Sequence, residues 1–176
     1  MKNKIVLTLI AALCGMSSVA HAADAGNGVV EFSGSVIDAP CSINSTDSTQ
    51  LVELGQLSNS LLNGGAQGAG SAKAVLFDLK LEDCAVTTLK NVKVTFNAMT
   101  KTGAPTMILN NGDAEGVFVS IYQGTTALNM GTASSAATLI NGSNHLEFSA
   151  GVVGDGSTLV TPGTIRATAS FTLSYV

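Results

Sequence analysis

Apolar and polar residues alternate with a period of two along much of this chain, which is typical of β-strands with one buried face. The clearest case is the carboxyl-terminal segment, residues 163–176. Every odd position there is apolar or glycine, and every even position except Val176 is polar. The pattern predicts one long strand that continues to the last residue of the chain.

Shorter segments of the same kind recur between turn signals. Residues 110–113 read Asn-Asn-Gly-Asp and predict a turn, residues 59–71 are rich in Gly, Asn and Ser and predict an exposed loop, and residues 134–140 fit a single turn of helix. The other predicted strands span residues 29–37, 51–57, 73–83, 89–98, 107–109, 116–122, 126–130 and 145–153. Many short strands at this spacing predict an all-β sandwich.

The first 22 residues have the pattern of an export signal. Lys2 and Lys4 precede a short apolar run at residues 5–13, and Ala20-His21-Ala22 fits a signal peptidase site, so we expect a mature chain that starts at Ala23. The apolar run is too short to cross a bilayer as a helix, and we expect no integral membrane segment. A lipoprotein site at Cys14 is the weaker alternative, because Leu13 stands where a small residue is expected.

The composition narrows the classes of partner. Of the eight lysines and arginines, two lie in the signal segment, which leaves six against all twelve acidic residues. An acidic chain without a basic patch is a poor ligand for nucleic acid or for an anionic membrane. The abundance of glycine and the absence of tryptophan also favour strands and turns over helices.

Two cysteines, Cys41 and Cys84, remain after removal of the signal. In an exported chain they most simply form one disulfide. Metal binding is the alternative, but the mature chain offers one histidine, His145, and no Cys-x-x-Cys pair.

No group of residues in the sequence predicts an enzyme or a cofactor. His145 alternates with Leu146 and Phe148, which predicts a solvent-facing strand residue, and no Gly-x-Ser-x-Gly motif is present. The acidic turns at residues 111–115 and 155–156 hold possible calcium ligands, but neither follows EF-hand spacing, so a turn is the better interpretation.

The amino-terminal strand has an unusual glycine. Val30, Phe32 and Val36 alternate on one face, and Gly34 stands between them, where a side chain would normally pack. Glycine within a strand usually marks a place where a bulky group comes close.

These features together resemble the major pilin subunits of chaperone–usher fimbriae, the family of type 1 and P pili. The resemblance spans the mature chain. Its motifs are residues 28–43 with Cys41, residues 77–84 with Cys84, Gly163 fourteen residues from the end, and the penultimate Tyr175.

The resemblance implies an incomplete immunoglobulin-like sandwich that lacks its last strand. A donor strand from a periplasmic chaperone, and then from the next subunit, would complete it by β-strand addition. We therefore expect a signal peptide at residues 1–22, a donor-strand extension at 23–36 and a pilin domain at 37–176. Carried across by position, the donor residues are Val30, Phe32, Gly34 and Val36, and the acceptor or chaperone-binding residues are Gly163, Ile165, Ala167, Ala169, Phe171, Leu173 and Tyr175.

The implied function is that of a structural subunit of a surface fimbria that supports cell adhesion. The implied partners are other copies of the chain, a periplasmic pilus chaperone, an outer-membrane usher and other pilins of the same fibre. Two alternatives stay open: a minor adaptor pilin of the same fold, and a stand-alone secreted β-sandwich that binds carbohydrate. A tip adhesin is disfavoured, because the segment before Cys41 is too short for an extra lectin domain.

Overall fold

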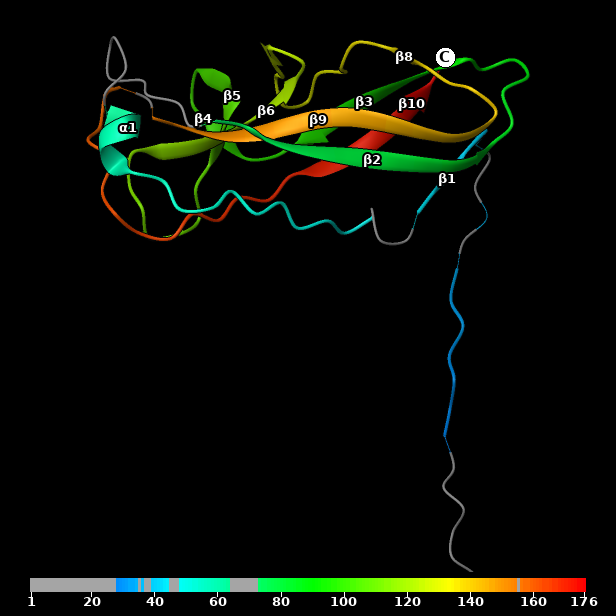
Figure 1. Cartoon of the computed structure of the whole chain (residues 1–176), viewed down its shortest axis with the longest axis horizontal. Helices are drawn as coiled ribbons and strands as arrows, with labels where there is room; N and C mark the ends of the chain where they lie inside the picture. The colour runs from blue at the N-terminus through cyan, green and yellow to red at the C-terminus, as the bar shows by residue number, and fades with distance from the viewer. Residues whose placement is uncertain (1–27, 35, 37–38, 45–47, 64–72, 155) are drawn as a thin grey trace, which may run out of the picture. The chain divides into compact units, whose positions relative to one another are not determined.

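The computed structural model describes residues 28–34, 36, 39–44, 48–63, 73–154 and 156–176. The predicted signal segment lies outside the described residues. Contacts within the chain divide it into residues 1–36 and residues 37–176. Two antiparallel sheets form the second unit (Figure 1).

The larger sheet has the strand order β1-β2-β9-β6-β5-β4, and the short strand β7 pairs with β6. Its strands are β1 (Ser42–Ile43), β2 (Val75–Cys84), β4 (Thr100–Lys101), β5 (Ala104–Leu109), β6 (Val117–Gln123), β7 (Thr126–Ala127) and β9 (Gly142–Gly154). The central pair is β2 and β9, in which Phe77 lies opposite Phe148 and Leu79 opposite Leu146. These residues face the core, so the period-two pattern of both strands follows from burial of one face.

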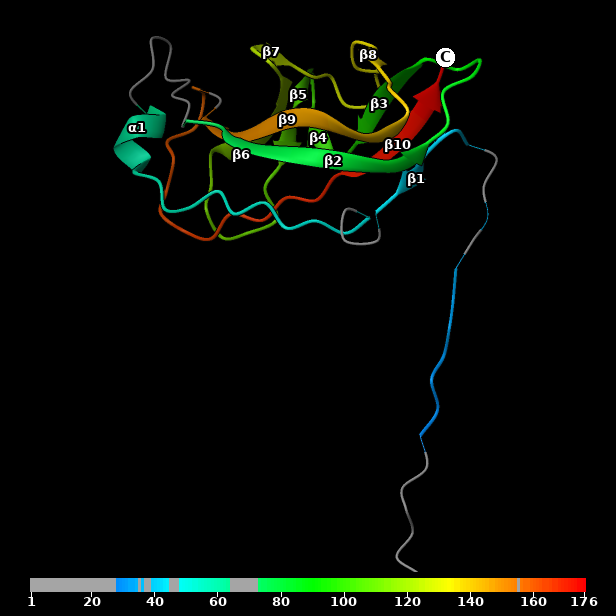
Figure 2. The ribbon, with the colours of Figure 1, turned by 45° about the vertical axis from the view of Figure 1, so that its right-hand side comes forward.

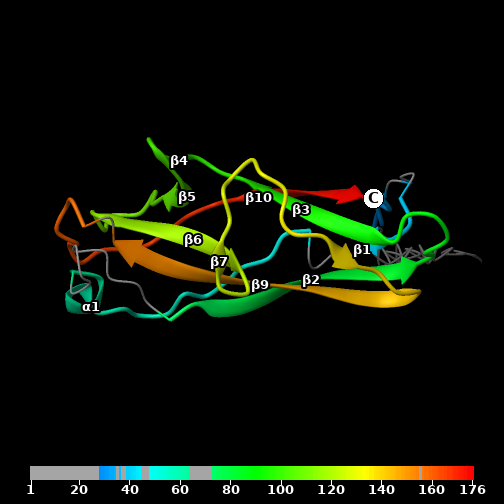
Figure 3. The same cartoon turned by 90° about the horizontal axis from the view of Figure 1, so that it is seen from above.

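The smaller sheet has the order β10-β3-β8, with β3 at Asn91–Asn97, β8 at Ala137–Thr138 and β10 at Ser170–Tyr175. Figure 3 shows β3 and β10 in one layer and β2 and β9 in the other. Between the layers lie Leu81, Val92 and Val94, three of the four most completely buried large side chains; the fourth, Val152, belongs to a separate cluster. The one helix among the described residues, α1 (Asn59–Asn63), covers a second small cluster with its buried Leu62.

The predicted strands at 73–83, 89–98, 116–122 and 145–153 are confirmed as β2, β3, β6 and β9. The prediction for residues 51–57 is wrong. Val52 and Leu54 do pack against the core, but Gly55 has a φ of 73° and the segment forms no ladder. The predicted helical turn at 134–140 is also wrong, because that segment contains β8. The predicted loop at 59–71 begins instead as α1, and residues 64–71 lie outside the described residues.

The two ends of the chain differ most from the prediction. Of the strand predicted at 29–37, residues 29–34 and 36 are coil, because a strand needs neighbours for its backbone groups and these residues have no ladder partner among the described residues. Residues 35 and 37 lie outside the described residues. The carboxyl-terminal strand is shorter than predicted: β10 begins at Ser170, and residues 163–169 belong to no strand.

A disulfide joins Cys41 to Cys84 at the end of β2, as the cysteine count predicted. The ladder between β2 and β9 shifts between Leu81 and Cys84, and Asp83 takes a left-handed φ of 51° within this irregularity. A cross-link between cysteines 43 residues apart stabilises the folded state by about 4 kcal/mol in the chain-entropy model, because it restricts the unfolded chain.

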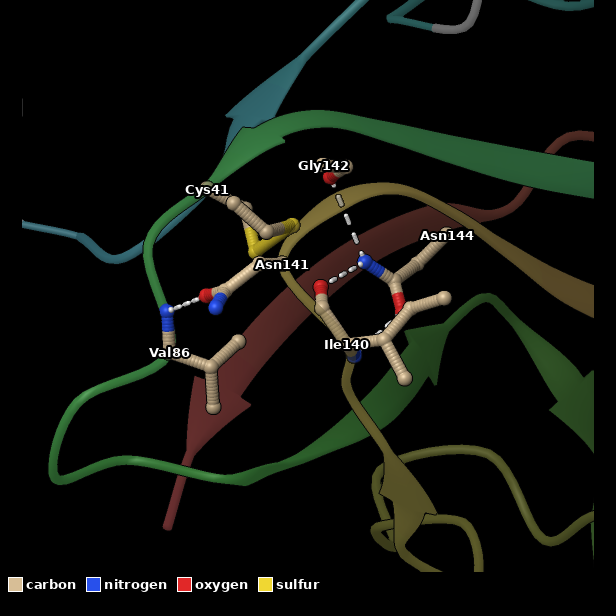
Figure 4. Close-up of a disulfide and its surroundings, with 7 residues drawn as sticks. Cys41, Val86, Ile140, Asn141, Gly142 and Asn144 are labelled. Atoms are coloured by element: carbon tan, nitrogen blue, oxygen red, sulfur yellow. Dashed lines mark hydrogen bonds between the residues drawn. A yellow bond between two sulfur atoms is a disulfide. The ribbon is translucent and has the colours of Figure 1, made fainter.

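Two asparagines hold the turn next to this disulfide (Figure 4). The buried Asn144 accepts a hydrogen bond from Ile140 N at 2.8 Å and donates to Ile140 O at 2.8 Å and to Gly142 O at 3.4 Å. The exposed Asn141 accepts one hydrogen bond from Val86 N at 2.7 Å. Asn144 therefore satisfies the backbone where the chain enters β9.

We predict that Asn144→Ala lowers the free energy of unfolding by about 1–3 kcal/mol, because it removes the three hydrogen bonds that this buried amide makes to the turn. The measurement is the midpoint of urea unfolding. Asn141→Ala is the matched control, and its single exposed hydrogen bond should contribute about 0.5–1.5 kcal/mol. Equal losses for the two variants would contradict the role given to Asn144.

Candidate functional site: an open sheet edge

Among the described residues, the terminal strand β10 pairs with a neighbouring strand on one side only. It pairs with β3 from Ser170 opposite Asn97 to Tyr175 opposite Val92, and no described strand lies along its other edge. The hydrogen bonding to β3 continues past the strand, because Val176 N donates to Asn91 O and Asn91 N donates to Val176 O, each at 2.9 Å. The strand is thus fixed to its end on one side and open on the other.

Side chains of β10 alternate as the sequence predicted. Phe171, Leu173 and Tyr175 are half-buried and pack against the core, whereas Ser170, Thr172 and Ser174 are exposed. Half-burial of the inward row means that the sandwich covers these side chains incompletely. An open backbone edge beside a partly covered apolar row is an adhesive surface.

The facing margin of the larger sheet is also incomplete. That sheet ends at the two-residue strand β1, and residues 50–57 continue along the margin without a ladder. Figures 1 and 2 show this segment and residues 160–168 following the same lower margin of the sandwich, and Figure 3 places them in different layers. Half-buried apolar side chains from both margins pack against the core, among them Ile43, Val52, Leu54, Phe77, Ile165 and Phe171.

Four phenylalanines join the two margins through the core. Phe96 and Phe148 are buried and meet edge to face with ring centroids 5.1 Å apart. Phe77 of β2 lies 6.3 Å from Phe96 and 5.9 Å from Phe148, and Phe171 of β10 lies 6.3 Å from Phe96. We call these four residues the phenylalanine floor. It fills the space between the sheets at this point of the open edge.

The first half of the predicted acceptor segment lies outside β10. Ile165 and Ala169 are half-buried, whereas Gly163 and Ala167 are exposed. Gly163 passes so close to the loop at 113–114 that a Cβ would lie 2.4 Å from Ala114 N. The glycine is therefore required for backbone contact with that loop.

The predicted donor residues are exposed. The accessible surfaces of Val30, Phe32 and Val36 are 74%, 90% and 103% of the reference value for a fully exposed residue. A Cβ on Gly34 would meet nothing within 4 Å. Exposed apolar side chains that gather in one contiguous patch are typical of an interaction surface.

Sequence reasoning missed Asn110 and Thr164, which bind the terminal segment to the loop at 110–116. The only signal was the Asn-Asn-Gly-Asp turn. Such a turn indicates a change of direction and gives no sign of the distant segment that the loop contacts.

His145 is exposed, as predicted, and its Nδ1 lies 2.7 Å from Asp78 Oδ2 on the neighbouring strand. This hydrogen bond lowers the pKa of the Asp78 carboxyl from its ordinary value. Among the described residues no three His, Cys, Asp or Glu side chains lie together as a metal site would require. In the same part of the chain no helix has the length and apolarity to cross a membrane.

Comparison with known proteins gives a consistent result. Residues 30–176 match the family model described as "Fimbrial protein". The chain is 42% identical to the Fimbria A protein of Serratia marcescens, with 98% of each chain covered, and 38% identical to the Major MR/P fimbria protein of Proteus mirabilis, again with 98% of each covered.

Solved structures show the same fold. A chain from the structure of a chaperone–usher pilus, which concerned the molecular basis of rod uncoiling, superposes with a TM-score of 0.75 at 32% identity, covering 86% of this chain and 97% of that one. The P pilus rod subunit PapA superposes with a TM-score of 0.69 at 26% identity, covering 78% of this chain and all of that one. The sandwich is thus the incomplete immunoglobulin-like fold of the chaperone–usher pilins.

Burial raises the pKa of the Tyr175 phenol, because an apolar surrounding disfavours the charged phenolate. The free energy of unfolding should therefore fall as the pH rises above about 10, the ordinary tyrosine pKa, and through the raised value. We expect part of the tyrosinate absorbance to appear at higher pH in the folded chain than in the unfolded chain. Tyr175→Phe should remove that part and Tyr122→Phe should retain it. The opposite result would show that Tyr175 is solvated.

Proposed function

Because the chain belongs to the fimbrial protein family, we propose that it is the repeating structural subunit of the shaft of a chaperone–usher fimbria, displayed on the cell surface. The observation that carries this proposal is the open edge of β10 beside its half-buried apolar row. The fibre forms when the amino-terminal extension of one copy supplies the missing strand of the next.

The donor and acceptor rows are complementary in chemistry and in period. Val30, Phe32 and Val36 repeat every second residue, as do the inward residues of β10, so one extended strand faces the open edge with all three side chains. Burial of these three side chains contributes about 5–8 kcal/mol before the cost of ordering the strand. Backbone hydrogen bonds along the edge add about 0.5–1.5 kcal/mol each.

The phenylalanine floor gives a reason for Gly34. Four rings already occupy the space between the sheets where β2 and β10 face each other. A donor strand that crosses this point needs a position without a side chain, and Gly34 is the one such position in the donor row. Gly34 thus sets the register, with the larger Phe32 to one side of the floor.

The open edge also dictates the assembly partners. An uncovered apolar row with free backbone groups aggregates, so a periplasmic pilus chaperone covers it with a strand until an outer-membrane usher brings the next subunit. The partners in the fibre are further copies of the chain and other pilins. The role is mechanical, so it requires neither catalysis nor a cofactor.

Two observations support a shaft subunit over a minor adaptor. The Proteus mirabilis relative is named a major fimbria protein, and PapA is named a rod subunit. No named relative supports a stand-alone carbohydrate-binding sandwich. That function would also not account for the exposed apolar row at Val30, Phe32 and Val36.

Fibre assembly in cells that carry the matching chaperone and usher tests the proposal. We expect Gly34→Leu to slow fibre growth about tenfold or more, because overpacking a close-fitting site costs about 1–3 kcal/mol. Ser33→Leu is the matched control. It adds the same side chain to the opposite face of the donor strand, so growth should stay within about twofold of the unchanged chain.

A third variant tests the donor segment itself. A chain without residues 23–33 should still form a one-to-one complex with the chaperone, and it should add to no fibre through its own amino terminus. Normal fibres from this variant, or a stable free monomer made without any chaperone, would contradict the proposal.

A further inference from the structure

The terminal segment changes its partner just before β10. From Ser170 onward it pairs with β3, whereas its earlier part pairs with the loop at residues 110–114. Asn111 N donates to Arg166 O at 2.7 Å, and Ala114 N donates to Thr164 O at 3.1 Å. Residues 167–169 have no backbone hydrogen bond to any described residue.

The side chain of Asn110 holds this junction together with both of its polar atoms. Asn110 Oδ1 accepts hydrogen bonds from Gly112 N at 3.0 Å and from Arg166 N at 2.7 Å. Asn110 Nδ2 donates to Ala114 O at 2.7 Å and to Thr164 O at 3.3 Å. An amide group supplies two donors and two acceptor sites, and all are used here, so no other side chain of this length replaces it.

Close packing reinforces the amide. Thr164 Oγ1 accepts from Asp113 N at 3.0 Å and donates to Asp113 Oδ2 at 2.7 Å. A Cβ on Gly112 would overlap the carbonyl of Thr164, and a Cβ on Gly163 would overlap the backbone of Ala114. We call Asn110, Gly112, Asp113, Gly163 and Thr164 the Asn110 clamp.

The clamp leaves one edge of the segment free. Successive residues of an extended chain direct their backbone groups to opposite edges. Thr164 O and both backbone groups of Arg166 point to the loop, so the backbone groups of Ile165 and Ala167 point to the opposite edge. That is the edge along which β10 is open, and Ile165 packs against both core clusters there.

We propose that Asn110 is a positioning residue for strand exchange, which keeps residues 164–166 extended and their free edge presented before a donor strand arrives. The inference rests on the proposed function. Without the clamp, residues 163–169 would have a strand on neither side, and the incoming strand would have to order them as it binds. The clamp therefore acts on the rate of entry of the donor strand at this end of the edge.

The test follows the uptake of a fluorescent peptide of residues 23–36 by the full chain, released from its chaperone, alongside hydrogen exchange of the amides of residues 165–169. Asn110→Ala should slow uptake about tenfold, since it removes two hydrogen bonds to the terminal segment and two that hold the loop in shape. It should also speed exchange of the Arg166 amide, which donates to Asn110 Oδ1. Asn110→Asp keeps both acceptor contacts of the side chain and loses both donors. Its rate of peptide uptake should lie between the rates of the unchanged chain and of Asn110→Ala.

Asn144→Ala is the matched control, because the Asn144 amide also accepts and donates hydrogen bonds to backbone groups of a turn, but none of those groups belongs to the terminal segment. It should lower the unfolding midpoint and leave uptake within about twofold. If Asn110→Ala slows uptake only as far as its loss of stability accounts for, as judged against Asn144→Ala, the positioning role is overturned. If the unchanged chain takes up no peptide, the proposed function is overturned and the clamp's role with it.

Discussion

The unpaired edge of β10 is the constraint on which the rest of the molecule depends. Backbone groups in a sheet need partners, and apolar side chains need cover. Here β10 has a complete ladder to β3 and no described strand on its other side, while Phe171, Leu173 and Tyr175 are only half-buried. The chain has its complementary apolar row at its amino-terminal end, in residues that are exposed. In the proposed fibre, one strand with this row satisfies both needs.

The remainder of the sandwich keeps that edge in place while it waits for a partner. The Cys41–Cys84 disulfide and the Asn144 turn fix the end of β2 and the start of β9. The phenylalanine floor connects β2 to β10 across the core. At the other end the Asn110 clamp ties the terminal segment to its loop. These devices stabilise a domain that lacks one of its strands.

Much of this fold was predictable from the alternation of residue types, because burial of one face produces it directly. The strands β2, β3 and β9 and the inward row of β10 followed from this pattern, and the disulfide followed from the count of cysteines. The pattern gave a wrong prediction where residue types alternate but the backbone pairs with no neighbouring strand. Val52 and Leu54 alternate toward the core without a ladder, and residues 29–34 and 36 alternate without a ladder partner in the described part of the chain. The Asn110 clamp was not predictable, because the four side-chain hydrogen bonds that join its loop to the terminal segment connect residues 51 to 56 positions apart and leave no local pattern.

The most direct test of strand exchange is a set of contacts measured in the assembled fibre. Fibres grown from an equal mixture of ¹³C-labelled and ¹⁵N-labelled chains would be studied by solid-state NMR for contacts between the two labels. The predicted result is a set of intermolecular contacts between residues 30–36 of one copy and residues 165–175 of another. Contacts between these segments within a single copy, or no contacts between them at all, would contradict strand exchange as the basis of the fibre.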